Sequence, residues 1–183
     1  MSAAIKYAPH YHVEDYRLWK GDWELWDGIA IAMTPSPFGA HQAILVALAS
    51  ELRGALRDAR CHATVLVELD WIIKSDTVVR PDVIVVCGDP PEGHLQSPPA
   101  LIAEILSPST RQNDLTYKRE LYASQGVGIY LIVDPELNWI ELLTLSSQGD
   151  YESNDAPERL RLALCGDCDI EVPVSSIFTG KQR

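Results

Sequence analysis

Two short hydrophobic runs, at residues 80–86 and 101–106, constrain the fold more than any other part of the chain. The first run ends in four consecutive apolar residues, which is typical of a strand covered on both faces. Each run also contains one carboxylate, Asp82 in the first and Glu104 in the second. A buried carboxylate is costly unless a partner or a cation stabilises it. The two runs therefore predict a central sheet and, at the same place, a functional site.

The rest of the hydrophobic pattern surrounds this sheet with helices and further strands. We expect helices at 12–20, 41–59 and 114–125, a hairpin at 23–33 that turns at Asp27-Gly28, and strands at 64–73, 77–86, 101–106, 129–133, 139–145, 160–164 and 169–172. The polar segment 149–158 is expected to be a loop. The predicted fold is an α/β domain with a central mixed β-sheet flanked by helices and an N-terminal β-hairpin.

Composition and charge limit the class of protein. The chain has 183 residues, of which 46% are hydrophobic, and it suits a single domain over residues 1–183. It contains no run of about eighteen apolar residues, as a membrane span needs, and its first residues lack the pattern of a signal peptide, so we expect a soluble cytoplasmic protein. The net charge of −11 opposes nonspecific attraction to nucleic acid.

The four cysteines are expected to be reduced, because the chain shows no export signal. Cys165 and Cys168 have the spacing of a zinc knuckle, but structural zinc needs four ligands and no second Cys or His pair follows them. The favoured interpretation of this segment is an ordinary turn between two strands.

The alternation of a strand makes the two carboxylates more specific. Glu104 shares a strand face with Ile102 and Leu106, so it projects among apolar neighbours. A second carboxylate nearby, Asp82, would repel it unless a divalent cation lay between them. Two hard oxygen ligands favour Mg²⁺, with Mn²⁺ as a substitute, over zinc.

On the following helix, Asp114 and Lys118 lie four residues apart and share a face. A lysine there could orient a water, take its proton if burial lowered the pKa of the lysine, or stabilise charge on a phosphate. The alternative is purely structural: Glu104 and Lys118 form a buried ion pair, and Asp82 and Asp114 cap a turn and a helix. Residue types alone favour neither interpretation.

The segment RPDVIVV, followed by PALIAEILSPSTRQNDLTYKRELYASQGVGIYLIVDP at 99–135, closely resembles the Uma family of restriction endonuclease-like proteins, within the PD-(D/E)XK nuclease superfamily. The segment WELWDGIAIAMTPSPFGAHQAI at 23–44 is similar to the N-terminal hairpin of that family and the helix, led by a histidine, that follows it. The resemblance extends over nearly the whole chain and implies a restriction endonuclease-like core.

The resemblance also implies roles for individual residues. Asp82 matches the aspartate of the Pro-Asp motif, and Glu104 matches the second metal-binding carboxylate. The usual lysine of the superfamily would fall at position 106, where this chain has Leu106. The Uma pattern instead takes its lysine from the next helix, which here is Lys118. Glu24 corresponds to an early acidic residue that can face the same metals.

His41 corresponds to the histidine that opens the long helix, although a role at the start of the helix is favoured over catalysis. We expect Tyr117, Tyr122 and Tyr130 to pack in the core, with a hydroxyl lining the pocket as the alternative. Asp114 is expected to cap its helix or to contact Lys118.

These observations predict a Mg²⁺-dependent endonuclease that hydrolyses phosphodiester bonds of DNA and that could act as a homodimer. Asp82, Glu104 and the backbone carbonyl of Ile105 would hold one metal. Lys118 would position the attacking water, and Glu24 would help to hold a second cation or a water. Two alternatives remain: a catalytically silent binding or regulatory module with the same fold, and a hydrolase that uses Asp82 and Glu104 as a proton-transfer pair without metal.

Overall fold

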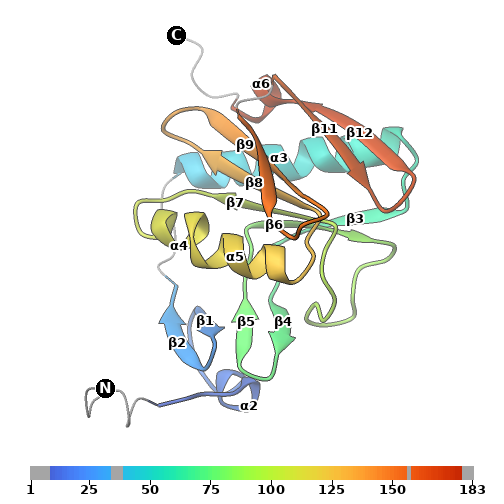
Figure 1. The fold of residues 1–183 in the computed structure, drawn as a ribbon. Coiled ribbons are helices and arrows are strands. Elements are labelled where there is room, and N and C mark those ends of the chain that lie inside the picture. Colours follow the sequence, from blue (N-terminus) through green and yellow to red (C-terminus); the bar gives the residue numbers. More distant parts are fainter. Residues whose placement is uncertain (1–8, 34–38, 156–157, 179–183) are drawn as a thin grey trace.

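The structure, a computed structural model, describes residues 9–33, 39–155 and 158–178 (Figure 1). A six-stranded mixed sheet lies at its centre, in the order β10-β9-β8-β7-β6-β3. Its strands are β3 (Ala63–Val67), β6 (Val83–Cys87), β7 (Leu101–Ile105), β8 (Ile129–Asp134), β9 (Trp139–Leu145) and β10 (Tyr151–Asp155). Only β7 and β8 are parallel among the paired strands of this sheet that the structure describes. The predicted central mixed sheet is therefore confirmed.

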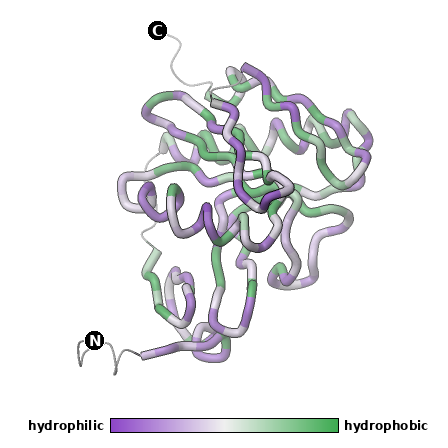
Figure 2. Tube along the Cα trace, in the orientation of Figure 1, coloured by the Kyte–Doolittle hydropathy of each residue, from purple (hydrophilic) through white to green (hydrophobic). Residues whose placement is uncertain are grey.

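Different elements cover the two faces of this sheet (Figure 1). Helix α3 (Gly39–Asp58) packs on the face that contains Val83 and Ala103. Helix α5 (Tyr117–Ser124) lies over the other face, where Ile84 and Ile102 contact Tyr122. Because β6 and β7 are covered on both sides, their apolar side chains are almost completely buried. Figure 2 shows the hydrophobic residues concentrated in these central strands.

A second, four-stranded sheet has the order β2-β1-β5-β4. It consists of the predicted hairpin, β1 (Trp23–Trp26) and β2 (Ile29–Ala32), together with β5 (Thr77–Val79) and β4 (Trp71–Lys74). Helix α2 (Val13–Tyr16) packs against β1 and is much shorter than the predicted helix at 12–20. Among the described residues, no helix is long and apolar enough to cross a membrane.

The strands predicted at 64–73 and 77–86 were each too long. Each one is split between the two sheets, at Glu68 and at Pro81. Glu68 has a positive φ of 50°, which a strand residue does not adopt. Pro81 has no N–H to donate to a sheet ladder. As a result the chain leaves the central sheet, forms β4 and β5, and returns at Asp82, which therefore lies where the two sheets meet.

The helix predicted at 114–125 is also divided. It consists of α4 (Arg111–Leu115) and α5, with Thr116 at a non-helical φ of −122° and ψ of −87° between them. The Thr116 hydroxyl donates a hydrogen bond to the carbonyl of Gln112 at 2.7 Å, which satisfies a group that a continuous helix would have used itself. Asp114 and Lys118 therefore lie on two consecutive helices.

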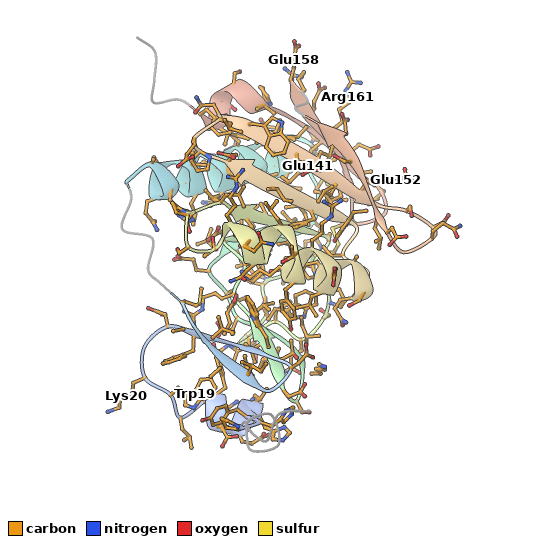
Figure 3. The ribbon with its side chains drawn as sticks, turned by 60° about the vertical axis from the view of Figure 1, so that its left-hand side comes forward. Trp19, Lys20, Glu141, Glu152, Glu158 and Arg161 are labelled. Carbon is orange, nitrogen blue, oxygen red and sulfur yellow. A yellow bond between two sulfur atoms is a disulfide. The ribbon has the colours of Figure 1, made fainter. Side chains whose placement is uncertain are left out.

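The C-terminal part forms a separate hairpin of β11 (Arg159–Leu164) and β12 (Cys168–Pro173), followed by helix α6 (Val174–Ile177). This hairpin packs on α3 and forms a two-stranded sheet of its own, separate from the central sheet. The segment predicted as a loop at 149–158 contains β10. Figure 3 shows Glu152, Glu158 and Arg161 pointing outward from these C-terminal strands.

The prediction of reduced cysteines differs from the structure. Two disulfides join Cys61 to Cys168 and Cys87 to Cys165, with a Cα–Cα distance of 5.5 Å in each pair. They attach the turn of the β11–β12 hairpin to the end of the β3–β6 strand pair. The sequence could not reveal the partners of Cys165 and Cys168, because Cys61 and Cys87 lie far from them along the chain.

Candidate active site

The predicted site residues from the central sheet and its helices meet in one place. A cavity of about 340 Å³ is lined by five of these residues: Asp82, Glu104, His41, Asp114 and Lys118. Glu104 lies in β7 on the face covered by α5, where it contacts Lys118 and Tyr122. Asp82 immediately precedes β6, and its side chain contacts the backbone N–H of Ile105 and His41 of α3. Glu24, from β1, is not among the residues lining this cavity, but its carboxylate forms an ion pair with the Lys118 ammonium. The convergence expected from the sequence is present.

Lys118 is the centre of a buried cluster of charges. Its Nζ lies 3.0 Å from Oε1 of Glu104, 3.2 Å from Oε1 of Glu24 and 3.5 Å from Oδ1 of Asp114. Burial alone would lower the pKa of Lys118, but the negative charges of these three carboxylates raise it well above its ordinary value. Lys118 therefore remains an ammonium ion near neutral pH and cannot serve as the base that accepts a proton from water.

Glu104 is 3% exposed and has different surroundings at its two oxygens. Oε1 accepts hydrogen bonds from the Lys118 ammonium at 3.0 Å and from the Tyr122 hydroxyl at 2.6 Å. Oε2 accepts a long bond of 3.4 Å from the backbone N–H of Asp82. Burial raises the pKa of Glu104 well above its ordinary value, against the opposing charge of Lys118. A further positive charge at Oε2 would therefore stabilise the carboxylate.

Asp82 holds a fixed orientation at the edge of the cavity. Its Oδ2 accepts a hydrogen bond of 2.7 Å from the backbone N–H of Ile105 and lies 3.4 Å from Nε2 of His41. Its side chain remains 19% exposed, which leaves it accessible from the cavity. Because Oδ2 is engaged in these contacts, Oδ1 is the oxygen left to bind a ligand.

His41 opens into the same cavity from the first turn of α3. Burial lowers the pKa of His41, but the contact with Asp82 and its negative charge outweigh this effect, so the pKa is raised overall. Its Nδ1 is buried without a hydrogen-bond partner in the part of the chain that the structure describes. The favoured prediction gave His41 a role only at the start of its helix, whereas the structure also places it against Asp82.

Asp114 is 1% exposed, and burial is the main cause that raises its pKa to about 6. Its Oδ1 has no hydrogen bond among the described residues, although the Lys118 ammonium lies 3.5 Å away. The Tyr130 hydroxyl donates a 3.0 Å bond to the backbone carbonyl of Asp114 and fixes this end of α4. Asp114 therefore contributes a charge next to Lys118 and has little access to solvent.

Glu24 is committed to contacts within the protein. Its Oε1 accepts a 2.7 Å bond from the backbone N–H of Arg80, and its Oε2 accepts a 2.9 Å bond from the indole N–H of Trp26. Together with the Lys118 contact, these bonds occupy both oxygens. In this arrangement Glu24 supports Lys118, while its expected role toward a second cation or a water stays a prediction.

The side chains around the cavity offer oxygen donors to a divalent cation. In the described ranges, no three His, Cys, Asp or Glu side chains are arranged to hold a metal ion. Two carboxylates, Asp82 and Glu104, do line the same cavity, and Oε2 of Glu104 has a hydrogen bond of 3.4 Å, which is long. Mg²⁺ keeps several waters and commonly binds proteins through one or two carboxylates plus substrate phosphate, so this pair fits a hard cation. The backbone carbonyl of Ile105 remains a predicted third ligand.

The sequence prediction missed one contact of the site, that of Tyr122. We expected this side chain to pack, and it does, because it is fully buried and stacks near Trp71 with ring centroids 6.1 Å apart. It also donates its hydroxyl to Glu104. The only available signal was its spacing, because Tyr122 follows Lys118 by one helical turn and so shares its face.

Comparison with solved structures identifies a protein of the same fold. The chain matches a crystal structure described as "a putative nuclease belonging to DUF820" from Anabaena variabilis, with a TM-score of 0.72 and 19% sequence identity. The match covers 92% of this chain and 98% of the other. At this level of identity the match establishes the fold. No curated protein is detectably similar to the chain.

A family model described as "Putative restriction endonuclease" matches residues 13–174, which is most of the chain and includes every site residue discussed above. The predicted resemblance is thereby confirmed, and the chain belongs to the Uma2 family of restriction endonuclease-like proteins.

Proposed function

We propose that the protein is a metal-dependent endonuclease that hydrolyses phosphodiester bonds of DNA. The observation that carries this proposal is the convergence of Asp82, Glu104 and Lys118, from two strands and a helix, on one cavity. The family and the fold both support a nuclease. The choice of Mg²⁺ and of DNA rests on the chemistry of these side chains and on the family.

Asp82 would hold the cation through Oδ1, and Glu104 would hold it through Oε2, which now accepts the long 3.4 Å bond from the Asp82 N–H. When bound, Mg²⁺ supplies Lewis acidity, which makes water more acidic and withdraws charge from a phosphate. Oδ2 of Asp82 is fixed by the N–H of Ile105, and Oε1 of Glu104 is fixed by Lys118 and Tyr122. These bonds hold both carboxylates in one orientation, so little reorganisation is needed when the substrate binds.

Lys118 would act through its charge. Because three carboxylates raise the pKa of Lys118, its ammonium stays protonated, and it can donate a hydrogen bond to the attacking water or to a phosphate oxygen. The developing negative charge of the transition state is stabilised by this fixed positive charge. In this proposal Lys118 does not take a proton from the water.

The acidity of the cavity requires cations before an anionic substrate can enter. Asp22 and Glu68 line the cavity together with the carboxylates already described. The positive charge of Arg80 is engaged by Asp70 at 2.6 Å and by Asp22 at 2.8 Å. Bound divalent cations would reverse the local potential and draw the phosphate toward Lys118. DNA binding should therefore depend on the metal.

A plasmid assay tests the proposal. Purified protein is incubated with supercoiled and linear DNA in Mg²⁺ or Mn²⁺, beside Asp82→Asn and a matched control, Asp150→Asn. Asp150 is exposed, and it lies in the turn between β9 and β10, away from the cavity. We expect cleavage by the wild type and the control, and none by Asp82→Asn or in the presence of EDTA. Equal cleavage by Asp82→Asn would refute the proposed site.

A catalytically silent module is the second candidate, and one observation favours it. Lys118 already neutralises Glu104 without a metal, as in a purely structural buried ion pair. Calorimetric titration with Mn²⁺ separates the two possibilities, because a silent module should show no binding that depends on Asp82. Activity that survives EDTA would instead support the hydrolase without metal.

Cleavage of both DNA strands would need two active sites, which a symmetric homodimer would supply. Light scattering coupled to gel filtration, with and without a DNA duplex, tests this part of the proposal. A mass of one chain under all conditions would contradict a dimer and would predict nicking of single strands.

A further inference from the structure

The Tyr122 hydroxyl is a buried polar group whose partner belongs to the candidate metal site. The side chain is completely buried, and the hydroxyl donates a hydrogen bond of 2.6 Å to Oε1 of Glu104. A tyrosine hydroxyl carries its proton near neutral pH, and a carboxylate oxygen can only accept, so the hydroxyl is the donor. A bond of this length between a hydroxyl and a carboxylate belongs to the stronger class of hydrogen bonds.

The same oxygen of Glu104 has a second donor from the same helix. Lys118 and Tyr122 are four residues apart on α5, so both project toward the central sheet from one face of the helix. With donors at 3.0 Å and 2.6 Å, Oε1 is occupied from the helix side. The carboxylate is therefore held with Oε2 directed to the other side, where its contact is the N–H of Asp82.

The Tyr122 ring cannot easily move away from this position. It lies edge-on against Tyr130, with ring centroids 5.2 Å apart, and close to Trp71, which is itself 1% exposed. Tight packing of this kind holds a side chain in one rotamer. The position of the hydroxyl is therefore set by the core and does not depend on contact with solvent or ligand.

We propose that Tyr122 is a positioning residue of the metal site, whose hydroxyl, together with Lys118, holds Oε1 of Glu104 so that Oε2 faces Asp82 and can bind a divalent cation. The proposal rests on the proposed function, because that function assigns the cation to Asp82 and Glu104. It adds a residue that touches neither metal nor substrate but determines how tightly the cation is held.

Tyr122→Phe is the direct test, because it removes one oxygen and keeps the ring. Mn²⁺ affinity is measured by calorimetry on the wild type, Tyr122→Phe, Asp82→Asn and a control, Tyr151→Phe. The Tyr151 hydroxyl donates to the backbone carbonyl of Val127 at 2.9 Å and is not part of the cavity lining. Circular dichroism checks that each variant is folded. Tyr122→Met, which also lacks the hydroxyl and adapts to irregular space, serves as a second variant.

Loss of an outer partner of a metal ligand typically weakens metal binding by about 10- to 100-fold. We expect this loss for both Tyr122 variants, and less than about a twofold change for Tyr151→Phe. In the cleavage assay, the Mg²⁺ concentration for half-maximal rate should rise by a similar factor, while the rate at saturating Mg²⁺ falls much less. Loss of a tyrosine that only supports the fold would not raise the required Mg²⁺ concentration while leaving the rate at saturating Mg²⁺ largely unchanged.

The outcomes separate the two proposals. If Asp82→Asn abolishes Mn²⁺ binding but Tyr122→Phe binds as tightly as the wild type, the role of Tyr122 is wrong and the metal site stands. If Tyr151→Phe weakens binding as much as Tyr122→Phe, the effect is general and the role of Tyr122 is also wrong. If the wild type shows no binding that depends on Asp82, both proposals fail.

Discussion

Replacing Lys118 with methionine tests the electrostatic account of the site without any substrate or metal. The substitution keeps most of the side-chain volume and removes the ammonium that lies within 3.5 Å of three carboxylates. Those carboxylates belong to Glu24, Glu104 and Asp114, none of which is more than 3% exposed. The variant would therefore leave three buried acidic groups without their counter-ion.

The expected loss of stability follows from two limits. Removing one partner of a buried ion pair costs about 3 to 5 kcal/mol. A buried carboxyl that has lost its counter-ion can take up a proton, so the cost of protonation is the upper limit of the free energy lost at each carboxyl. For an unfolded pKa of 3.8, as for Asp114, this cost at pH 7 is about 4 kcal/mol. We expect Lys118→Met to lower the free energy of unfolding by about 3 to 5 kcal/mol at pH 7, a large part of the roughly 5 to 15 kcal/mol of a typical domain.

The pH dependence of this loss gives a second check. Without Lys118, the folded-state pKa values of Glu104 and Asp114 rise further, so the folded variant binds more protons than the unfolded chain between about pH 4 and 7. Stability then increases as the pH falls, by about 1.4 kcal/mol per pH unit for each proton taken up. The deficit relative to the wild type should therefore shrink between pH 7 and pH 5.

Urea unfolding followed by tryptophan fluorescence measures these free energies. Lys74→Met is the control, because Lys74 is 52% exposed and pairs with Asp27 and Asp76 at the surface. An exposed pair of this kind contributes about 1 kcal/mol or less. If Lys118→Met lost no more stability than Lys74→Met, or if its deficit did not shrink at pH 5, the account of a buried, charge-compensated cluster would be refuted.

Three further outcomes are expected. The pKa of Asp114 is raised from 3.8 to about 6, so the folded state binds this proton more tightly than the unfolded chain, and the contribution of Asp114 falls by at most about 3 kcal/mol as the pH rises through that window. Asp114→Asn should remove this part of the difference between pH 4 and 7 in urea unfolding, and an unchanged profile would contradict it. Reducing the disulfides should lower the melting temperature, because the Cys61–Cys168 bridge spans 107 residues and closing such a loop is worth about 4 to 5 kcal/mol in the chain-entropy model. Mass spectrometry without reductant should find four fewer hydrogens than with reductant, at about 4 Da, and equal masses would show that the bridges are absent in solution. Leu52→Ala, in the fully buried face of α3, should cost about 2 to 5 kcal/mol, whereas Val46→Ala, at a position 60% exposed, should cost well under 1 kcal/mol. Similar losses in the two variants would contradict the assigned face of the helix.

The central strands and the helix on them could be predicted because their patterns are strong and local. The apolar run after Asp82 admits only a strand covered on both faces, and the spacing of leucines such as Leu48 and Leu52 admits only an amphipathic helix. The position of Glu104 on the same face as Ile102 then followed from the alternation of strand residues. These parts of the site needed no long-range information.

The parts that could not be predicted depend on contacts between distant segments. Glu68 reads as an ordinary strand residue, and only the path into the second sheet requires its positive φ. The presence of Pro81 was an available signal for a break, because proline cannot continue a central ladder. The bond from Tyr122 to Glu104 joins residues 18 apart, and the only local signal for it was the helical spacing of Tyr122 from Lys118. No local pattern relates the cysteines of either disulfide.

The position of the lysine explains how these buried carboxylates can fold without a cation. Leu106, at the position where the superfamily usually has its lysine, is 5% exposed and packs in the core beneath α5. The positive charge comes from Lys118 on that helix, and it reaches Glu104 on the same face of the sheet at 3.0 Å. From this side it also contacts Glu24 and Asp114, so one ammonium stabilises three buried carboxylates. The helix thus supplies the counter-ion that keeps the cluster stable without a cation, and it does so at the oxygen of Glu104 that faces away from Asp82. Asp82 and Glu104 both line the same cavity, where the proposed cation would bind.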